Sequence, residues 1–475
     1  MQSVADSLAR LRSLATSPIV SRLAEAFADA GFELALVGGP VRDALLGRAV
    51  HDLDLTTDAR PDDILRVVGP LAETTWDVGR AFGTIAARVD GETVEITTYR
   101  ADSYDGATRK PTVEFGDSLA GDLVRRDFTV NALALRVPQI KLEDPSGGVD
   151  DLLAKVLRTP IDPAVSFGDD PLRMLRAARF AAQLGFEVAA ETMDAMSRMR
   201  ESLQIVSAER IRDELVKLLA AQTPRPGLEL LVHTGLAESV LPELPALRLE
   251  IDAEHRHKDV YEHSLTVLDQ AIGYEHSRHP GEPPDVTLRL AALLHDIGKP
   301  ATRKLEPGGA VSFYNHDLVG ARMARKRLSA LRFDNETIAA VSRLIELHLR
   351  FFGYTDGAWT DSAVRRYVRD AGDQLERLHI LTRSDVTTRN RRKAERLAFA
   401  YDDLEARIAE IKEQEELDAI RPDLDGNQVM RLLELKPGPE VGEAMRFLME
   451  LRLDEGPLGE EEATRRLLDW WRARP

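Results

Sequence analysis

Cysteine is absent from this chain of 475 residues, so disulfide bonds, thiolate metal sites and cysteine nucleophiles are excluded. No apolar run approaches the roughly 18 residues that are needed to span a bilayer. Basic residues are outnumbered, with 63 Lys and Arg against 80 Asp and Glu, and the formal net charge is −17. This balance argues against a protein that coats nucleic acid indiscriminately, but it leaves room for a local basic groove.

The N-terminal residues also lack the uninterrupted apolar core of a signal peptide, because they include Asp6, Arg10, Arg12 and Arg22. Charged residues make up 30% of the chain and apolar residues 43%, which is typical of a soluble globular protein. We therefore expect a soluble, cytoplasmic protein with no membrane partner. The length predicts about three domains.

The first third of the chain is predicted to be mixed α/β and the rest helical. Residues 34–37 form a short apolar run, and residues 84–89 and 93–99 have strand-like composition. The Asp90-Gly91 pair between the last two runs is a strong hairpin signal. From about residue 161 the pattern becomes helical and stays so, which predicts the α+β class with an all-α continuation.

Two carboxylates stand two positions apart in the alternating segment that includes Asp52, Leu53 and Asp54. On a β-strand both acids leave the same face while the leucines enter the core. Acids placed in this way repel each other unless a cation lies between them, and oxygen ligands suit Mg²⁺. The alternative interpretation is a solvated strand edge that carries two acids.

A glycine turn precedes this acid pair by about a dozen residues. Gly38-Gly39 ends the predicted strand, and a helix begins at once, so backbone N–H groups could approach a phosphate there. Arg42 lies in the first turn of that helix and could reach the same phosphate. The turn alone is weak support, but a following acid pair at this distance strengthens the interpretation considerably.

Segments in this order resemble the class II tRNA nucleotidyltransferases, the CCA-adding enzymes and their poly(A) polymerase relatives in the DNA polymerase beta superfamily. The resemblance spans roughly residues 34–220 and covers five ordered motifs. The matching stretches are Leu36 to Gly47 with His51 to Asp54, Arg125 to Ala132, Asp144 to Arg158, Asp169 to Arg173, and Arg210 with Glu214. The resemblance implies a polymerase-beta-type head at residues 1–160, a helical neck that reads the nucleobase at 161–250, a helical domain at 251–400 and a helical tail at 401–475.

The resemblance also implies roles for individual residues. In that family the aspartates that match Asp52 and Asp54 hold the catalytic metal ions, expected here to be Mg²⁺. The positions that match Gly39 and Arg42 contact the triphosphate, as does an arginine of the second motif, which we take to be Arg126. A third carboxylate on the hairpin strand, Glu95, could face the metal ions, but a structural or solvated glutamate is equally open.

The neck carries a pair of residues suited to choosing C and A without a template. Asp170 and Arg173 are three apart, so we expect them to lie near one another on a helix. A carboxylate and a guanidinium together complement the amine and the acceptor that cytosine and adenine share. The family is thought to select CTP and ATP in this way. Arg176 and Arg179 continue the spacing and are predicted to bind nucleotide, although a solvated basic face is the alternative. The family usually has Glu where Asp169 stands.

Histidines cluster in the helical body. Eight of the eleven lie between positions 255 and 348, around the adjacent pair His295-Asp296. With His263 before this pair and Asp385 after it, the order resembles the HD phosphohydrolase superfamily and implies a second divalent-metal site. A helical domain that keeps the shape and lacks activity is the alternative. The residues that resemble the extra ligands of dinuclear members are His316 and His348.

Two basic runs and one loop complete the picture. Residues 322–332 hold five basic residues and no acid, and residues 383–396 hold six basic residues and two acids. Both runs are candidate tRNA contacts, with solvated helix faces as the alternative. Residues 101–111 are predicted to form a loop beside the catalytic strand whose deletion impairs AMP addition more than CMP addition.

The leading hypothesis is an enzyme that adds CCA to the 3′ end of tRNA from CTP and ATP by Mg²⁺-dependent nucleotidyl transfer. A poly(A) polymerase, or an enzyme that adds only C or only A, is the nearest alternative. Another is a metal-dependent HD phosphohydrolase with an inactive head. A pure RNA-binding scaffold has no need for the acid pair or the base-reading pair. The sequence leaves the oligomeric state open.

Overall fold

The computed structural model describes residues 4–50, 52–100, 115–116, 118–249, 259–307, 311–355, 359–388, 390–415 and 421–474. These residues fall into two compact units, 1–240 and 241–475. The first unit contains the predicted head and most of the predicted neck. His51 and the predicted loop at 101–111 lie outside the described residues.

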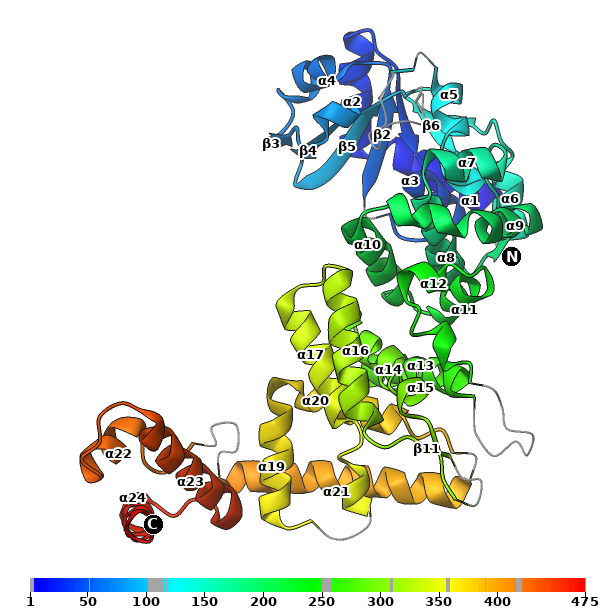
Figure 1. Cartoon of the computed structure of the whole chain (residues 1–475). Helices are drawn as coiled ribbons and strands as arrows, with labels where there is room; N and C mark the ends of the chain where they lie inside the picture. Colours follow the sequence, from blue (N-terminus) through cyan, green and yellow to red (C-terminus); the bar gives the residue numbers. More distant parts are fainter. Residues whose placement is uncertain are drawn as a thin grey trace. The chain divides into compact units, whose positions relative to one another are not determined.

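A mixed seven-stranded sheet forms the centre of the first unit (Figure 1). Its strands follow the order β3-β4-β5-β2-β1-β6-β7, and only β2 and β5 pair in parallel. This arrangement confirms the predicted α+β class. The strands are β1 (Leu34–Val37), β2 (Leu53–Thr57), β3 (Thr74–Trp76), β4 (Thr84–Val89), β5 (Glu92–Thr98), β6 (Ala134–Val137) and β7 (Lys141–Glu143).

Helices surround the sheet and continue into the neck, where β8 (Val156–Leu157) pairs in parallel with β9 (Glu187–Val188). The α-helices are α1 (Val4–Ala15), α2 (Pro18–Asp29), α3 (Gly39–Leu46), α4 (Pro61–Val68), α5 (Leu119–Val124), α6 (Gly148–Ala154), α7 (Pro163–Asp169), α8 (Leu172–Leu184), α9 (Ala190–Met199), α10 (Ala208–Leu219), α11 (Arg225–His233) and α12 (Ala237–Val240). The 3₁₀ helices are η1 (Arg80–Phe82), η2 (Thr129–Asn131) and η3 (Arg200–Ile205).

Strand β1 is buried along its whole length, which explains its continuous apolar sequence. Its neighbour β2 buries Leu53 and Leu55, so Asp54 between them faces the other side of the sheet. Behind β1, Tyr99 and Leu123 belong to a cluster of fully buried side chains. The sheet core therefore fixes the strand ends at which the acid pair and the glycine turn lie.

The second unit is almost entirely helical, and a long helix, α21, crosses it (Figure 1). Helix α13 packs on α14 and α20, and α14 also packs on α17. The α-helices are α13 (Val260–Arg278), α14 (Val286–Leu294), α15 (Lys299–Thr302), α16 (His316–Ala330), α17 (Asn335–Leu347), α18 (Phe352–Thr355), α19 (Asp361–Ala371), α20 (Leu375–Ser384), α21 (Arg391–Glu415), α22 (Gly426–Leu432), α23 (Pro439–Glu455) and α24 (Glu460–Arg472). The remaining elements are η4 (Pro245–Leu247), η5 (Gly372–Gln374), β10 (Lys304–Leu305) and β11 (Val311–Ser312).

Candidate active site and metal centre

A pocket of about 420 Å³ opens at the ends of β1 and β2 in the first unit. Asp52, just before β2, is exposed, and Asp54, the second residue of β2, is half-buried. The pocket brings together seven of the residues that were predicted from the sequence. These are Gly39, Arg42, Asp52, Asp54, Arg126, Arg176 and Arg179.

The surroundings of Asp54 disfavour the ionised form of its carboxyl group. Burial raises its pKa to about 6, and Glu95, then Asp52, add to this effect. Glu95 is the direct register partner of Asp54 in the parallel β2–β5 pair, and it is exposed. Three carboxylates therefore gather at one edge of the pocket, where a cation would relieve their mutual repulsion.

The glycine turn lets the side chain of Arg126 lie close to the backbone. Gly38 caps α3 with a φ of 72°, and a Cβ at this position would lie only 3.2 Å from Arg126 Nη1. Arg126 is held from behind by Asp122, whose buried carboxylate is 3.1 Å from Arg126 Nη2. Burial alone would raise the pKa of Asp122, but Arg126 and Arg125 lower it below its ordinary value. The negative charge of Asp122 thus fixes Arg126 beside the turn.

A chain of polar contacts runs from α3 to the neck helix α8. Arg42 donates to both carboxylate oxygens of Asp43 at 2.9 Å and to Asn131 Oδ1 at 2.7 Å. Asn131 donates in turn to Asp127, which also accepts from Arg176 Nε at 2.7 Å. Burial opposes ionisation of Asp127, but Arg176 and Asn131 lower its pKa to about 2. The chain joins residues that are far apart in the sequence.

The two distal arginines of α8 share a buried acid and an aromatic ring. Glu214 on α10 lies 2.7 Å from Arg179 Nε and 3.7 Å from Arg176 Nη1. The guanidinium of Arg179 lies 4.2 Å from the centroid of the Phe180 ring. Because the ring and the carboxylate both hold Arg179, its direction into the pocket is fixed.

The predicted base-reading pair is arranged differently from the expectation. Asp170 does not lie on the helix: it precedes α8 in an extended conformation, with φ −146° and ψ 100°. Its carboxylate accepts from Leu172 N and pairs with Arg210 at 2.8 Å. The guanidinium of Arg173 donates to Ser166 Oγ and to the carbonyl oxygen of Arg125 rather than to the Asp170 carboxylate. Asp170 is extended because the ring of Pro171 disfavours the helical conformation for the residue before it, and α8 therefore begins at Leu172. Neither residue lines the pocket of the acid pair.

Four further pocket residues were given no role from the sequence, although three lie within or beside matched motifs. Asp127 and Asn131 stand in the second motif, and Phe180 directly follows the last of the spaced arginines. The fourth, Lys217, carries no local signal, because only the packing of α10 against α8 brings it to the pocket.

In the second unit, six side chains from five helical segments meet at one buried point. His263 Nε2 lies 2.9 Å from Asp385 Oδ1, and His295 Nε2 lies 3.6 Å from the same oxygen. Asp296 is 3.2 Å from His295 Nε2 through one carboxylate oxygen. The ligand atoms form two groups with metal-site spacing, His263, His295 and Asp385, and Asp296, His316 and His348.

Three of the four imidazoles in this cluster are held in the same way. Each directs Nδ1 at a main-chain carbonyl, His295 at Ala292, His316 at Phe313 and His348 at Ile345. Because a carbonyl can only accept, these Nδ1 atoms carry a proton, and Nε2 keeps its lone pair whenever the ring is neutral. Imidazoles that ligate metal ions are commonly fixed in this way. The fourth, His263, has Thr387 Oγ1 3.0 Å from its Nδ1 instead.

The donor set fits divalent metal ions. The Nε2 atoms of His295, His316 and His348 are buried and have no hydrogen-bond partner in the described part of the chain. Burial lowers the pKa of His348 to about 4, so this ring stays neutral. Burial opposes protonation of His295, but Asp296 and Asp385 raise its pKa to about 10, so a proton occupies a position that suits a cation.

The close packing of two helices beside this cluster depends on a glycine. A Cβ at Gly298 would lie 2.0 Å from the carbonyl oxygen of His316, so only glycine allows α15 to approach α16 this closely. Lys299, the next residue, places its ammonium 2.6 Å from Asp296 Oδ2. The His-Asp-Ile-Gly-Lys run therefore positions two ligands and one cation at the same point.

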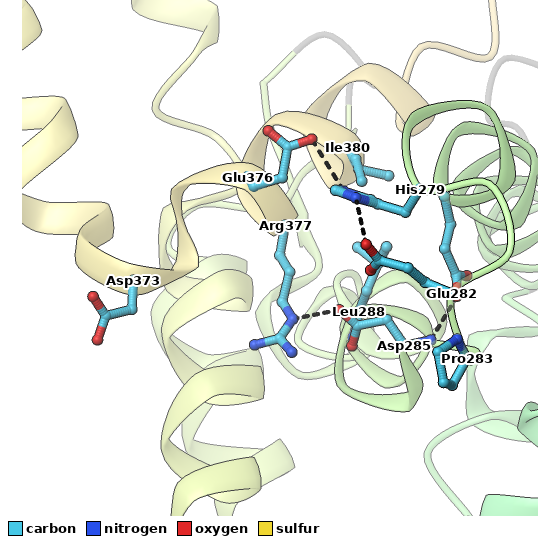
Figure 2. Close-up of a pocket in the computed structure, with 10 residues that line it drawn as sticks. His279, Glu282, Pro283, Asp285, Leu288, Asp373, Glu376, Arg377 and Ile380 are labelled. Atoms are coloured by element: carbon cyan, nitrogen blue, oxygen red, sulfur yellow. Dashed lines mark hydrogen bonds and ion pairs between the residues drawn. The ribbon is translucent and has the colours of Figure 1, made fainter. Parts of the chain in front are cut away.

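A second hollow in this unit, of about 270 Å³, lies where α13, α14 and α20 meet (Figure 2). His279 lies between Glu282 and Glu376, and Arg377 Nε is 2.6 Å from Asp285 Oδ2. These charges compensate one another, and the ion pairs around the hollow hold the helices together. None of the helices in the described residues is long and apolar enough to cross a membrane.

A small mixed sheet that presents an acid pair, a glycine turn and a guanidinium-lined pocket defines a nucleotidyltransferase. Residues 34–158 match the poly A polymerase head domain, residues 185–247 the probable RNA and SrmB-binding site of polymerase A, and residues 260–390 the HD domain. The A-adding tRNA nucleotidyltransferase of Deinococcus radiodurans is 34% identical over 92% of this chain and 95% of its own length. The chain belongs to the class II tRNA nucleotidyltransferase family and carries an HD domain.

Other relatives differ in how much of the chain they match. The CC-adding tRNA nucleotidyltransferase of Thermus thermophilus is 32% identical over 92% of this chain and 93% of its own length. The CCA-adding enzyme of Bacillus pumilus is 43% identical over 46% of this chain and 54% of its own length. The crystal structure of the Bacillus stearothermophilus CCA-adding enzyme in complex with CTP shares the fold, with 24% identity, a TM-score of 0.70 and coverage of 95% of this chain and 96% of that one.

Proposed function

We propose that this protein adds C, C and A to the 3′ end of tRNA in the cytoplasm, using CTP and ATP and no template. The pocket that unites the acid pair with the glycine turn and three α3 and α8 arginines carries this proposal. Relatives named as A-adding and CC-adding match nearly the whole chain, so addition of only part of CCA is the nearest alternative. Poly(A) synthesis is the next.

The acids and the glycine turn have separate roles in nucleotidyl transfer: the acids would bind the metal ion and the turn would bind the triphosphate. Asp52 and Asp54, with Glu95 beside them, would hold Mg²⁺, the hard divalent ion that suits oxygen donors. When bound, magnesium supplies charge that activates the terminal ribose hydroxyl and stabilises the departing pyrophosphate. The N–H groups at the start of α3 and the guanidinium of Arg126 orient the triphosphate.

Base selection is assigned to Asp170 and Arg173. In the structure the carboxylate of Asp170 pairs with Arg210, and the guanidinium of Arg173 donates to Ser166. Reading a base therefore requires both side chains to exchange these partners for the amine and the acceptor of C or A. Guanine and uracil would leave the two side chains mispaired, at a cost of about 1–3 kcal/mol for each buried group.

The deciding experiment is nucleotide incorporation by the purified full chain. The substrates are tRNA that lacks CCA and tRNA that ends in CC, with CTP alone, ATP alone and both together. We expect two C additions on the first substrate and one A addition on the second. Asp52→Ala with Asp54→Ala abolishes both, whereas His295→Ala changes neither. Long tails from ATP alone would overturn the proposal, and failure of one addition would favour a partial enzyme.

We propose a second activity, phosphoester hydrolysis, for the HD centre. The six convergent ligands and their partnerless Nε2 atoms support it. The test is hydrolysis of bis-p-nitrophenyl phosphate and of RNA ending in a 2′,3′-cyclic phosphate, after loading with manganese or cobalt. Asp296→Asn removes the activity while nucleotide addition continues. Bound metal without hydrolysis of either substrate would refute the activity.

A tRNA contact is proposed on α16. Arg322, Arg325 and Lys326 are exposed, and no carboxylate pairs with them among the described residues. Their counterparts Arg383 and Arg391 in the second basic run are paired with acids. Neutralising the three α16 cations is expected to reduce the slope of log affinity against log salt by about 2. The control neutralises Arg391, whose charge Glu395 already compensates, and an equal slope in the α16 variant and the wild type would refute the contact.

A further inference from the structure

Five cations line the nucleotide pocket of the first unit, and four of them are already paired with acids. Each arginine lies within 3.1 Å of a carboxylate oxygen. The pairs are Arg42 with Asp43, Arg126 with Asp122, Arg176 with Asp127, and Arg179 with Glu214. The arginines therefore supply fixed, directional donors but little net positive charge.

The fifth cation is Lys217, and it differs from the other four. It lies in the last turn of α10 and is exposed. In the described part of the chain no carboxylate forms an ion pair with its ammonium group. Its charge is therefore uncompensated, unlike that of the arginines.

The position of Lys217 is nevertheless fixed. Its carbonyl oxygen accepts from Gln183 Nε2 on α8 at 3.3 Å, and Glu214, one turn earlier, is buried against the α8 arginines. The backbone at Lys217 is thus anchored to the helix that carries Arg176 and Arg179. Only the side-chain torsion angles of Lys217 then determine where its ammonium group lies in the mouth of the pocket.

When a polyanion enters this pocket, the four arginines are already paired with carboxylates of the protein. An additional uncompensated point charge at the pocket wall attracts phosphate and adds hydrogen-bond donors without breaking an existing pair. We propose that Lys217 binds a phosphate group during nucleotide transfer, either on the incoming nucleoside triphosphate or on the 3′-terminal strand of the RNA. This role rests on the proposed function of the pocket.

The test compares Lys217→Gln, which removes the charge, with Lys217→Arg, which keeps it. We expect Lys217→Gln to raise one Michaelis constant about tenfold, the equivalent of one charged hydrogen bond. If the phosphate belongs to the nucleotide, KM for CTP and ATP rises and KM for tRNA is unchanged. If it belongs to the RNA, KM for tRNA rises and the salt slope of tRNA binding falls by about 0.7–0.9. Lys217→Arg retains most of the wild-type value in either case.

Arg212→Gln, on the same helix but outside the pocket, is the matched control and leaves both constants unchanged. Unaltered constants in Lys217→Gln overturn the proposal, as does a Lys217→Arg variant as impaired as Lys217→Gln. Equilibrium binding of CTP and of tRNA separates this inference from the proposed function. A wild-type chain that transfers no nucleotide, yet binds either ligand more tightly than Lys217→Gln does, would remove the proposed function and retain the phosphate contact.

Discussion

Replacing Asp54 with Asn is expected to make the first unit more stable while it abolishes nucleotide transfer. Burial, Glu95 and Asp52 raise the pKa of Asp54 from its usual 3.8 to about 6. An unfolded chain loses this proton near 3.8, whereas the folded chain retains it until about 6. The carboxylate therefore contributes no cost below the lower value, and its cost grows as the pH rises between the two values.

Above both pKa values this cost is about 3 kcal/mol, because each pH unit of separation is worth about 1.4 kcal/mol. Asp54→Asn removes the charge and keeps the shape, so in metal-free buffer near neutral pH the unit should gain up to this amount. Glu95→Gln removes the charge that, after burial, raises the pKa of Asp54 most. This variant should therefore gain a smaller part of the same stability. The matched control is Glu92→Gln, three positions earlier on β5, where its side chain leaves the opposite face.

The assay is hydrogen exchange measured by mass spectrometry on peptides from β1 and β2, because two compact units need not unfold together. Protection in Asp54→Asn should exceed that of the wild type at about pH 7 and match it at about pH 3, below both pKa values, where the carboxyl is protonated in the folded and the unfolded state. Magnesium should raise protection in the wild type and leave the variant unchanged. Equal or lower protection in metal-free Asp54→Asn at neutral pH would refute the reasoning.

Three further outcomes follow from the contacts around the two sites. Asp122→Asn frees Arg126 and should raise KM for both nucleotides about tenfold with little change in kcat, and an unchanged KM would contradict this role. Thr387→Val should weaken metal binding at the His263 group about tenfold in calorimetric titrations, with recovery in Thr387→Ser, because a hydroxyl alone fixes that Nδ1. His348→Gln should halve the bound metal measured by atomic emission, and an unchanged stoichiometry would exclude two subsites.

Local patterns in the sequence predicted the parts of the site that depend on neighbouring residues. Alternation placed Asp52 and Asp54 on one face of a strand because the side-chain period of a strand is two. The apolar run at 34–37 and the strand at 84–89 coincide with β1 and β4, and the strand predicted at 93–99 is displaced by one residue as β5. The adjacent pair His295-Asp296 predicted two members of the buried cluster of histidines and aspartates in the second unit.

The tertiary structure alone decided which distant residues meet. Asn131 lies 89 positions from Arg42, and Asp127 lies 49 positions from Arg176, so no local period could join them. The parallel register sets Glu95 beside Asp54, and helix packing brings Lys217 to the pocket. Sequence fixes which side chains are present and which face of an element they share. Their charges act on one another only across the short distances that packing creates, so protonation, pairing and free charge are properties of the folded chain.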